Sequence, residues 1–226
     1  MIPRLSIIMP VLNEAPTLAR ALHAAQVHRQ AGAELIVVDG GSDDATLALC
    51  AGHADRLLQA PRGRASQMNL GARQARAATL LFLHADPVLP ERAVDIVAAQ
   101  LAGGRHRWGR FDVSIVGRSG MLAVIAACMN MRSRLTGMAT GDQAIFVERE
   151  LFDAVGGFPA QPLMEDIELS RRLLRTGRPA CVDAKAVTSG RRWDQRGVWR
   201  TILLMWRLRL LYWLGVPAER LASAYR

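Results

Sequence analysis

The sequence is short of cysteine, lysine and aromatic residues. Of its 226 residues, three are cysteine, 5% are aromatic and one, Lys185, is lysine. Cys50, Cys128 and Cys181 lie far apart and form no CxxC pair, so neither a disulfide framework nor a structural zinc site is expected, and a reducing compartment fits. The scarcity of aromatic side chains also argues against a stacking surface for single-stranded nucleic acid.

Several common motifs are missing as well. The first apolar run, Leu5–Met9, is too short for the core of a signal peptide and has no basic segment before it. Neither GxGxxG nor GxxxxGK[ST] occurs, which argues against a dinucleotide-binding fingerprint and a P-loop. There is no internal repeat, low-complexity segment or long linker. We therefore expect one compact domain in the cytoplasm.

The composition is that of a globular protein with excess positive charge. Half of the residues are hydrophobic and 22% are charged, with a formal net charge of +9 that comes almost entirely from arginine. Such a charge favours an anionic substrate, an anionic membrane surface or nucleic acid as partner. Nucleic acid is the weakest of the three because the basic residues are spread along the chain.

Short apolar runs alternate with helical patterns in the first half of the chain, which is typical of an α/β protein with a parallel sheet. Strands are predicted at Leu5–Met9, Glu34–Asp39, Arg56–Gln59, Thr79–Leu83, Trp108–Val113 and Ala144–Val147. Helices are predicted after Pro16, from Ser42 or Asp43 through Cys50, and at Ser66–Ala77, Pro90–Leu101, Gly120–Leu135, Arg149–Val155 and Glu165–Arg175.

The C-terminal stretch Val198–Val216 is apolar and raises the question of a membrane. Arg200, Arg207 and Arg209 would each cost about 2.5–3.5 kcal/mol at the centre of a membrane-spanning helix, which disfavours a span. The tryptophans of this stretch recur every seven residues and form a stripe along a helix: Trp199, Trp206 and Trp213. The stripe is compatible with packing on the domain, with a homodimer or with peripheral contact to an anionic membrane.

Polar residues follow four of the predicted strands, where open α/β sheets bind their ligands. These segments are PVLNE from Pro10, DGGSDD from Asp39, RGR from Arg62 and HAD from His84. A single carboxylate such as Asp86 suffices to hold Mg²⁺ or Mn²⁺ when phosphate oxygens and water complete the shell, and His84 could ligate Mn²⁺ or bond the phosphate. The alternative for Asp86 is a turn before Pro87.

Other residues at the strand ends also allow two interpretations. Arg62 and Arg64 flank a glycine and suit phosphate oxygens, or they belong to a solvated basic loop. Asp39 would contact a nucleotide base or ribose, or would cap its own turn. Asn13 and Glu14 would contact the nucleotide, or would cap the next helix.

Four segments resemble, in order and spacing, the family 2 glycosyltransferases: PVLNE from Pro10, VVDGGSDD from Val37, FLHADP from Phe82, and GGF from Gly156 followed by MEDIELSRRL from Met164. The resemblance runs from about Leu5 to Gly177. It implies a GT-A fold, in which helices flank a central, mostly parallel sheet, here followed by a C-terminal apolar helix. Two positions depart from the family pattern: His84 replaces the first acid of the metal motif, and Gly40 replaces a second aspartate.

The resemblance also implies a function. It implies an inverting enzyme that moves a sugar from a nucleotide-diphosphate sugar, with Mg²⁺ or Mn²⁺, to an acceptor that the sequence leaves open, a lipid-linked one included. Pro10, Asn13 and Glu14 are implied to contact the nucleotide. Residues 1–113 would hold nucleotide and metal, residues 114–190 the acceptor, and residues 191–226 would form a helical extension.

The catalytic prediction concerns the start of the helix at Glu165. In the family's ED motif the aspartate is the general base, which corresponds to Asp166, with Glu165 in support. Acids at a helix start also complement the helix dipole, which is the simpler explanation. Asp142 and Gln143 are predicted to line the sugar or acceptor pocket, with a turn as the alternative.

Two other functions stay open at this stage. A nucleotidyltransferase that forms sugar nucleotides would use a similar half-fold, but it normally has a glycine-rich, basic loop after the first strand, and PVLNE contains no Gly, Lys or Arg. A non-catalytic module that binds sugar nucleotides is the third reading, and His84 in place of an acid favours it.

Overall fold

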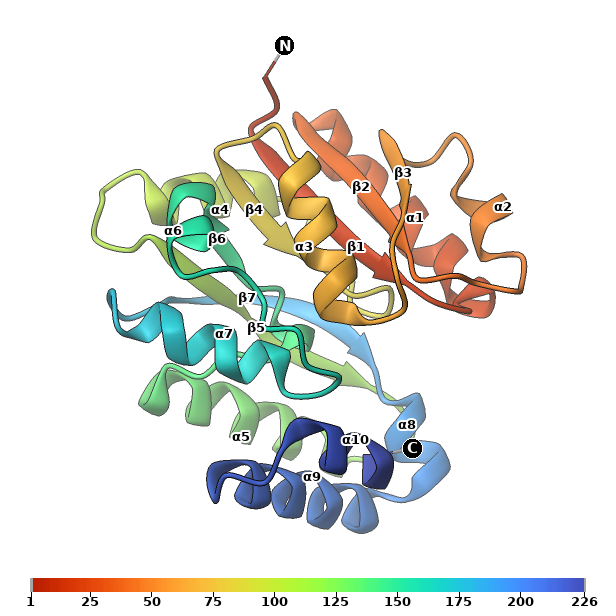
Figure 1. Ribbon diagram of the computed structural model, residues 1–226, viewed down its shortest axis with the longest axis vertical. Helices are drawn as coiled ribbons and strands as arrows, with labels where there is room; N and C mark the ends of the chain where they lie inside the picture. Colours follow the sequence, from red (N-terminus) through yellow and green to blue (C-terminus); the bar gives the residue numbers. More distant parts are fainter. Residues whose placement is uncertain (1, 226) are drawn as a thin grey trace.

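A seven-stranded sheet forms the centre of the computed structural model, which describes residues 2–225 (Figure 1). Its order is β3-β2-β1-β4-β6-β5-β7. Within this sheet only β6 runs antiparallel to its neighbours, β4 and β5. The strands are β1 (Leu5–Val11), β2 (Ala33–Asp39), β3 (Arg56–Gln59), β4 (Thr79–Phe82), β5 (Trp108–Val116), β6 (Phe146–Glu148) and β7 (Ala180–Ser189).

Helices cover both faces of this sheet. As a result β1 and β2 are buried on both sides, as parallel strands usually are. On β1, Ile7 and Met9 pack on one face in a cluster with α1 and α4, whereas Ile8 packs on the other face in a cluster with α3, α6 and α7. These helices are α1 (Ala15–Gln30), α3 (Arg64–Gln74), α4 (Ala93–Leu101), α6 (Arg149–Ala154) and α7 (Glu165–Leu174).

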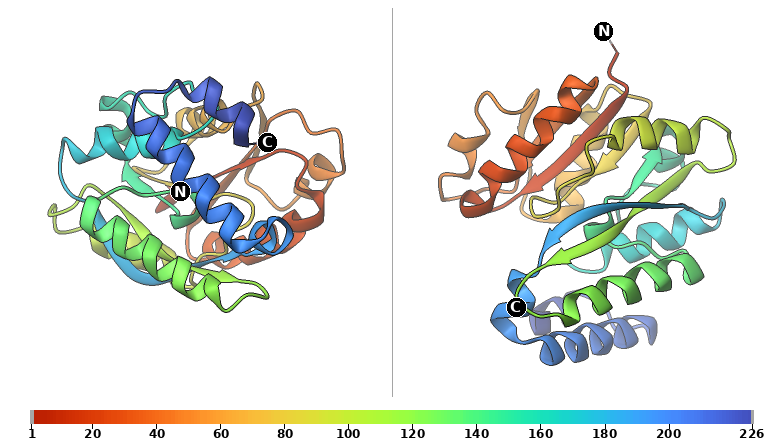
Figure 2. Two further views of the ribbon diagram at one scale, coloured as in Figure 1. Left: turned by 90° about the horizontal axis from the view of Figure 1, so that it is seen from below. Right: turned by 180° about the vertical axis from the view of Figure 1, so that it is seen from behind.

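A further layer lies beyond β5 and β7, at the lower end of Figure 1. There α5 (Met121–Thr136) and α9 (Val198–Trp213) lie side by side in both Figure 1 and Figure 2, and Ile125 of α5 shares an apolar cluster with Ile202 of α9. A second cluster joins Leu208 of α9 and Leu221 of α10 (Ala218–Tyr225) to Met164, just before α7. The C-terminal helices are thereby fixed to the sheet domain.

The predicted α/β fold is confirmed, with differences in several elements. Ala180–Ser189, for which no strand was predicted, forms β7 beside β5. The helix predicted from Ser42 or Asp43 starts later, as α2 (Thr46–Cys50), because the Ser42 N–H and hydroxyl donate to Asp39 instead. The short helices α8 (Arg191–Arg196) and α10 flank α9, which ends at Trp213 rather than continuing to 216.

Among residues 2–225, no helix is long and apolar enough to cross a membrane. The predicted regions 1–113 and 191–226 include residues 1 and 226, which lie outside the described residues.

Candidate functional site

A pocket of about 670 Å³ opens at the carboxyl ends of β1, β4 and β7. The strand order reverses between β1 and β4, which is where α/β sheets place their ligands. The start of α7 and the sides of α5 and α9 complete the walls. Its polar lining consists of Glu14, Arg64, His84, Asp86, Arg132, Thr140, Asp142, Glu165, Asp166, Thr188, Ser189, Arg192, Arg209 and Tyr225.

Asp166 lies in the first turn of α7, and the local backbone holds its carboxylate. Met164, directly before the helix, has a left-handed backbone with φ of 63°, a conformation that costs about 1–3 kcal/mol and is typical of functional sites. The Asp166 Oδ2 accepts the Gly141 N–H at 2.9 Å, and Oδ1 accepts the Ile167 N–H at 2.8 Å. Each oxygen keeps a free lone pair, so the carboxylate is oriented and still able to accept a proton.

Three acids of this pocket resist ionisation. Burial, reinforced by the Asp166 charge, raises the pKa of Glu165 to about 7. Burial also raises the pKa values of Asp166 and Asp142, and the charges of Asp166 and Asp86 add to the effect on Asp142. Carboxyl groups whose pKa values are raised by burial and by one another, inside a cleft, mark a candidate active site.

Two arginines supply the positive charge opposite these acids. Loss of water would lower the pKa of Arg64, but the charges of Glu165, Tyr225 and Asp142 outweigh this effect and raise it. The pKa of Arg132 is lowered, by burial, although the Asp166 charge acts against the shift. The Arg132 Nε and Nη2 are buried without a hydrogen-bond partner within the described chain. Arg132 therefore has donors available for a ligand in the pocket.

His84 and Asp86 follow β4 and line the same pocket. Burial, with the Arg64 charge adding to it, lowers the pKa of His84 to about 3, so its imidazole is neutral at physiological pH. Gly141 lies against this ring, and a Cβ there would overlap it, so only glycine fits. Among the described residues no group of three or more His, Cys, Asp or Glu side chains could enclose a metal ion. One carboxylate beside a neutral imidazole nevertheless fits an octahedral cation whose other ligands are phosphate oxygens and water.

The structure brings together eight of the twelve predicted site residues. Those that line the pocket are Pro10, Glu14, Arg64, His84, Asp86, Asp142, Glu165 and Asp166. The remaining four, Asn13, Asp39, Arg62 and Gln143, are not part of its lining.

Asp39 and Asn13 fasten the loops after β1 and β2 to each other. The buried Asp39 Oδ2 accepts the N–H groups of Gly41 at 2.8 Å and Ser42 at 3.0 Å. The Asn13 N–H donates to the Ser42 hydroxyl, and its Oδ1 accepts the Asp43 N–H, both at 3.0 Å. The Asp39 side chain thus holds its own turn, which was its alternative role. Asn13 bridges the two loops, and no side chain caps the start of α1. Contact of either side chain with a nucleotide stays a prediction.

Gln143 and Arg62 also have local surroundings. The buried Gln143 closes a capping box with Thr140 around η1 (Gly141–Gln143), whose turn places Gly141 beside Asp166. Arg62 is exposed in the loop between β3 and α3. Arg64, two residues later, reaches the pocket because it begins α3 after Gly63, whose φ of 142° favours glycine.

The analysis of the sequence missed Arg132, Arg192 and Tyr225. Arg192 stacks on the Tyr225 ring, 4.0 Å from its centroid, and donates a hydrogen bond to its hydroxyl. Apolar and polar residues alternate along Val182–Ala186, and this was the available sequence signal, because it predicts a strand whose carboxyl end leads to Arg192. Arg132 and Tyr225 carry no such signal.

Comparison with known proteins identifies both the fold and the family. The model of the family described as glycosyl transferase family 2 matches residues 6–146, more than half of the chain, and ends before α7. Comparison with curated proteins finds no match.

Solved structures share the fold at low identity. S. aureus TarS 1-349 is 18% identical with a TM-score of 0.68, over 82% of this chain and 60% of that one. Mannosyltransferase PcManGT from Pyrobaculum calidifontis, in complex with GDP-Man and Mn²⁺, is 21% identical with a TM-score of 0.61, over 92% and 61%. Glucosyl-3-phosphoglycerate synthase from Mycobacterium tuberculosis, with Mn²⁺ and UDP, is 18% identical with a TM-score of 0.62, over 95% and 81%.

The chain thus spans about three fifths of the TarS structure. The parallel sheet with its one antiparallel strand, the site at the ends of β1 and β4, and the family match agree with one another. This chain belongs to glycosyl transferase family 2 and has the GT-A fold.

Proposed function

We propose that this chain transfers a sugar from a nucleotide-diphosphate sugar to an acceptor hydroxyl, with inversion at the anomeric carbon. One observation carries the proposal: the oriented Asp166 carboxylate lies in the same pocket as Pro10, Glu14 and Asp86 at the ends of β1 and β4. We therefore assign the general base and the nucleotide site to one cavity.

The donor follows from the charge of the pocket and from the neighbours. TarS was solved with UDP-GlcNAc, and PcManGT with GDP-Man. In this chain Arg64 and Arg192 line the pocket beside the strand ends, and guanidinium groups match phosphate oxygens with two parallel hydrogen bonds. We propose that a sugar nucleotide binds with its diphosphate near these arginines and its sugar toward Asp142 and Asp166.

Asp86, with the neutral imidazole of His84 beside it, would hold a divalent cation. When bound, such a cation neutralises charge on the departing diphosphate. Two of the neighbouring structures contain Mn²⁺, which accepts imidazole nitrogen more readily than Mg²⁺ does. We therefore favour Mn²⁺ at this site.

Asp166 acts as the general base. It takes the proton of the acceptor hydroxyl while that oxygen forms its bond to the anomeric carbon, and the bond from this carbon to the diphosphate oxygen breaks with its electron pair. One such displacement inverts the configuration. The raised pKa of Asp166 makes it a stronger base than a solvated aspartate, and the N–H groups of Gly141 and Ile167 aim it.

The side of the pocket formed by α5 and α9, which we assign to the acceptor, is mostly apolar, with Arg132 and Arg209 as its charged residues. It is lined by Ile125 and Met129 of α5 and by Ile202 and Met205 of α9. An apolar wall that surrounds one unpartnered guanidinium suits an acceptor with a hydrocarbon part and an anionic group. A lipid-linked acceptor has this chemistry.

A thermal-shift panel tests the proposal. Nucleoside diphosphates of the common bases are added with and without Mn²⁺, and the base that binds raises the melting temperature by mass action. Release of free sugar from the matching sugar nucleotide then reports turnover without a known acceptor. A chain that binds a nucleotide but hydrolyses no donor with any metal would be a binding module instead.

A further inference from the structure

The outward side of α9 is apolar, the reverse of an ordinary surface helix. Five of its large side chains are more than half exposed: Trp199 68%, Leu203 65%, Trp206 70%, Leu210 56% and Trp213 81%. At 100° per residue they fall within an arc of roughly 80°. Thr201 and Leu208, on the opposite side, are buried against the domain. We call these five residues the α9 face.

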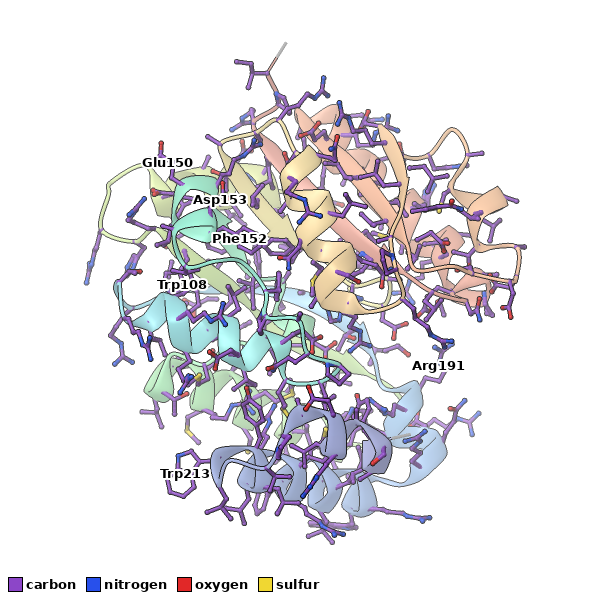
Figure 3. The ribbon with its side chains drawn as sticks, viewed as in Figure 1. Trp108, Glu150, Phe152, Asp153, Arg191 and Trp213 are labelled. Atoms are coloured by element: carbon purple, nitrogen blue, oxygen red, sulfur yellow. The ribbon has the colours of Figure 1, made fainter. Side chains whose placement is uncertain are left out.

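The α9 face lies at one end of the molecule, far from the N-terminus (Figure 1, Figure 2). Trp213 projects outward there, away from the domain (Figure 3). Monomeric proteins rarely leave a row of large apolar side chains in water, because burying such surface is favourable. The α9 face therefore has an occupant.

Arginines border the α9 face on both sides. Arg200 and Arg207 lie at one edge of the arc and are exposed, and Arg209 lies at the other edge. Acidic residues are absent from α9, and the chain as a whole carries +9. Tryptophan indoles between arginines match the headgroup layer of an anionic bilayer, where the ring meets acyl chains and the guanidinium meets phosphate.

We propose that the α9 face docks onto the surface of an anionic lipid bilayer, with α9 parallel to the membrane in the headgroup layer. A bilayer accounts for both the tryptophans and their arginine borders. A second copy of this chain would bring Arg200 and Arg207 against equally basic surroundings, which costs energy.

The pocket reaches this same face. Trp206 lines the pocket and belongs to the α9 face, and Val124 of α5, also in the lining, is 51% exposed. Docking would thus place the acceptor side of the pocket at the lipid surface. This consequence rests on the proposed function, in which the acceptor has a hydrocarbon part, whereas the docking itself does not.

Vesicle flotation without any nucleotide tests the docking. Vesicles of phosphatidylcholine with phosphatidylglycerol should bind the chain at low salt, vesicles of phosphatidylcholine alone should bind it less, and rising salt should release it, because screening weakens charge attraction. The double variant Trp199→Gln/Trp213→Gln should bind the anionic vesicles roughly tenfold or more weakly. Neither tryptophan lines the pocket, so donor hydrolysis should not change.

A matched pair of charge variants locates the surface. Arg200→Gln/Arg207→Gln and Arg20→Gln/Arg73→Gln remove the same charge from exposed positions, the second pair on α1 and α3, which lie outside the α5–α9 layer in Figure 1. The first pair should weaken binding several-fold more than the second. Equal effects would mean attraction by net charge alone and would overturn the docking at α9.

Two further outcomes contradict the proposal. One is the absence of flotation with anionic vesicles at low salt. The other is a dimer in sedimentation that Trp199→Gln/Trp213→Gln dissolves, which would assign the α9 face to a second copy. A melting temperature equal to that of the unchanged chain shows that the variants are folded. Because flotation uses no donor, its result stands apart from the outcome of the nucleotide panel.

Discussion

The two regions that flank the pocket use polar side chains differently. On the β1–β2 side, Asp39 and Asn13 hold the loops together, and their hydrogen bonds are made within the protein. On the α5–α7 side, burial raises the pKa values of Glu165 and Asp166, and Arg132 has buried nitrogens without a partner. A polar group that is satisfied internally builds the site, whereas one left unsatisfied at a cost in stability is available to a ligand.

The largest effect is expected at Asp166. Asp166→Asn keeps the shape of the side chain but removes the proton acceptor, so donor affinity should stay nearly intact while turnover falls by roughly 10²–10⁴-fold. Donor hydrolysis measures this if no acceptor is known. Glu165→Gln is the matched control and should cost less. If Glu165→Gln loses the activity and Asp166→Asn keeps it, the roles are reversed, and if neither loses it, Asp142 is the next candidate.

The second prediction concerns the metal. Asp86→Ala should weaken Mn²⁺-dependent binding of the nucleoside diphosphate by at least the roughly 10–100-fold that even an outer-shell partner of a metal contributes. Calorimetric titration with and without chelator measures it. His84→Ala, the neighbouring change, should have a smaller effect because a carboxylate carries the charge. Affinity that is the same in Asp86→Ala, with and without chelator, would remove the metal from the proposal.

The third prediction concerns the β1–β2 region, where the polar side chains bond within the protein. Asp39→Ala removes the buried carboxylate that accepts the N–H groups of Gly41 and Ser42, which should lower the free energy of unfolding by about 1–3 kcal/mol. Urea denaturation measures it. Arg62→Ala, in an exposed loop, is the control and should change stability by less than about 0.5 kcal/mol. A stable Asp39→Ala variant that has lost nucleotide binding would instead assign Asp39 to the ligand.

The first half of the fold could be predicted from the sequence because apolar runs that alternate with helical patterns usually form a parallel sheet covered by helices. The rule that ligands bind beyond the strand ends then grouped His84 and Asp86 correctly in the pocket. Arg64 and Arg62 show where this reasoning stops. They are two residues apart in one loop, yet only Arg64 reaches the pocket, because α3 begins at it.

Other parts of the site depend on contacts that are distant in sequence. Arg132 belongs to no motif in the sequence, and only the folded chain buries its nitrogens and brings it near the charge of Asp166. The role of Asp39 could not be chosen in advance, since turn capping and base binding both require a carboxylate at the end of a buried strand. Arg192 was missed because β7 was missed.

The last effect expected is a dependence of stability on pH that comes from Glu165. Its pKa in the folded chain is about 7, above the value near 4.5 of an unfolded chain, so the folded state binds the proton more tightly. This contribution to stability is fully present below about pH 4.5 and is lost as the pH rises to about 7. The melting temperature should therefore fall between pH 5 and pH 8.

Glu165→Gln isolates that contribution, because glutamine resembles the protonated acid at every pH. The variant should lose less stability between pH 5 and pH 8 than the unchanged chain, and at pH 8 it should be the more stable of the two. Glu150→Gln, an exposed change on α6, should reproduce the unchanged chain. The same slope in all three proteins would show that Glu165 is ionised in the folded state, and the acids of α7 would then resemble the satisfied acids of the β1–β2 side.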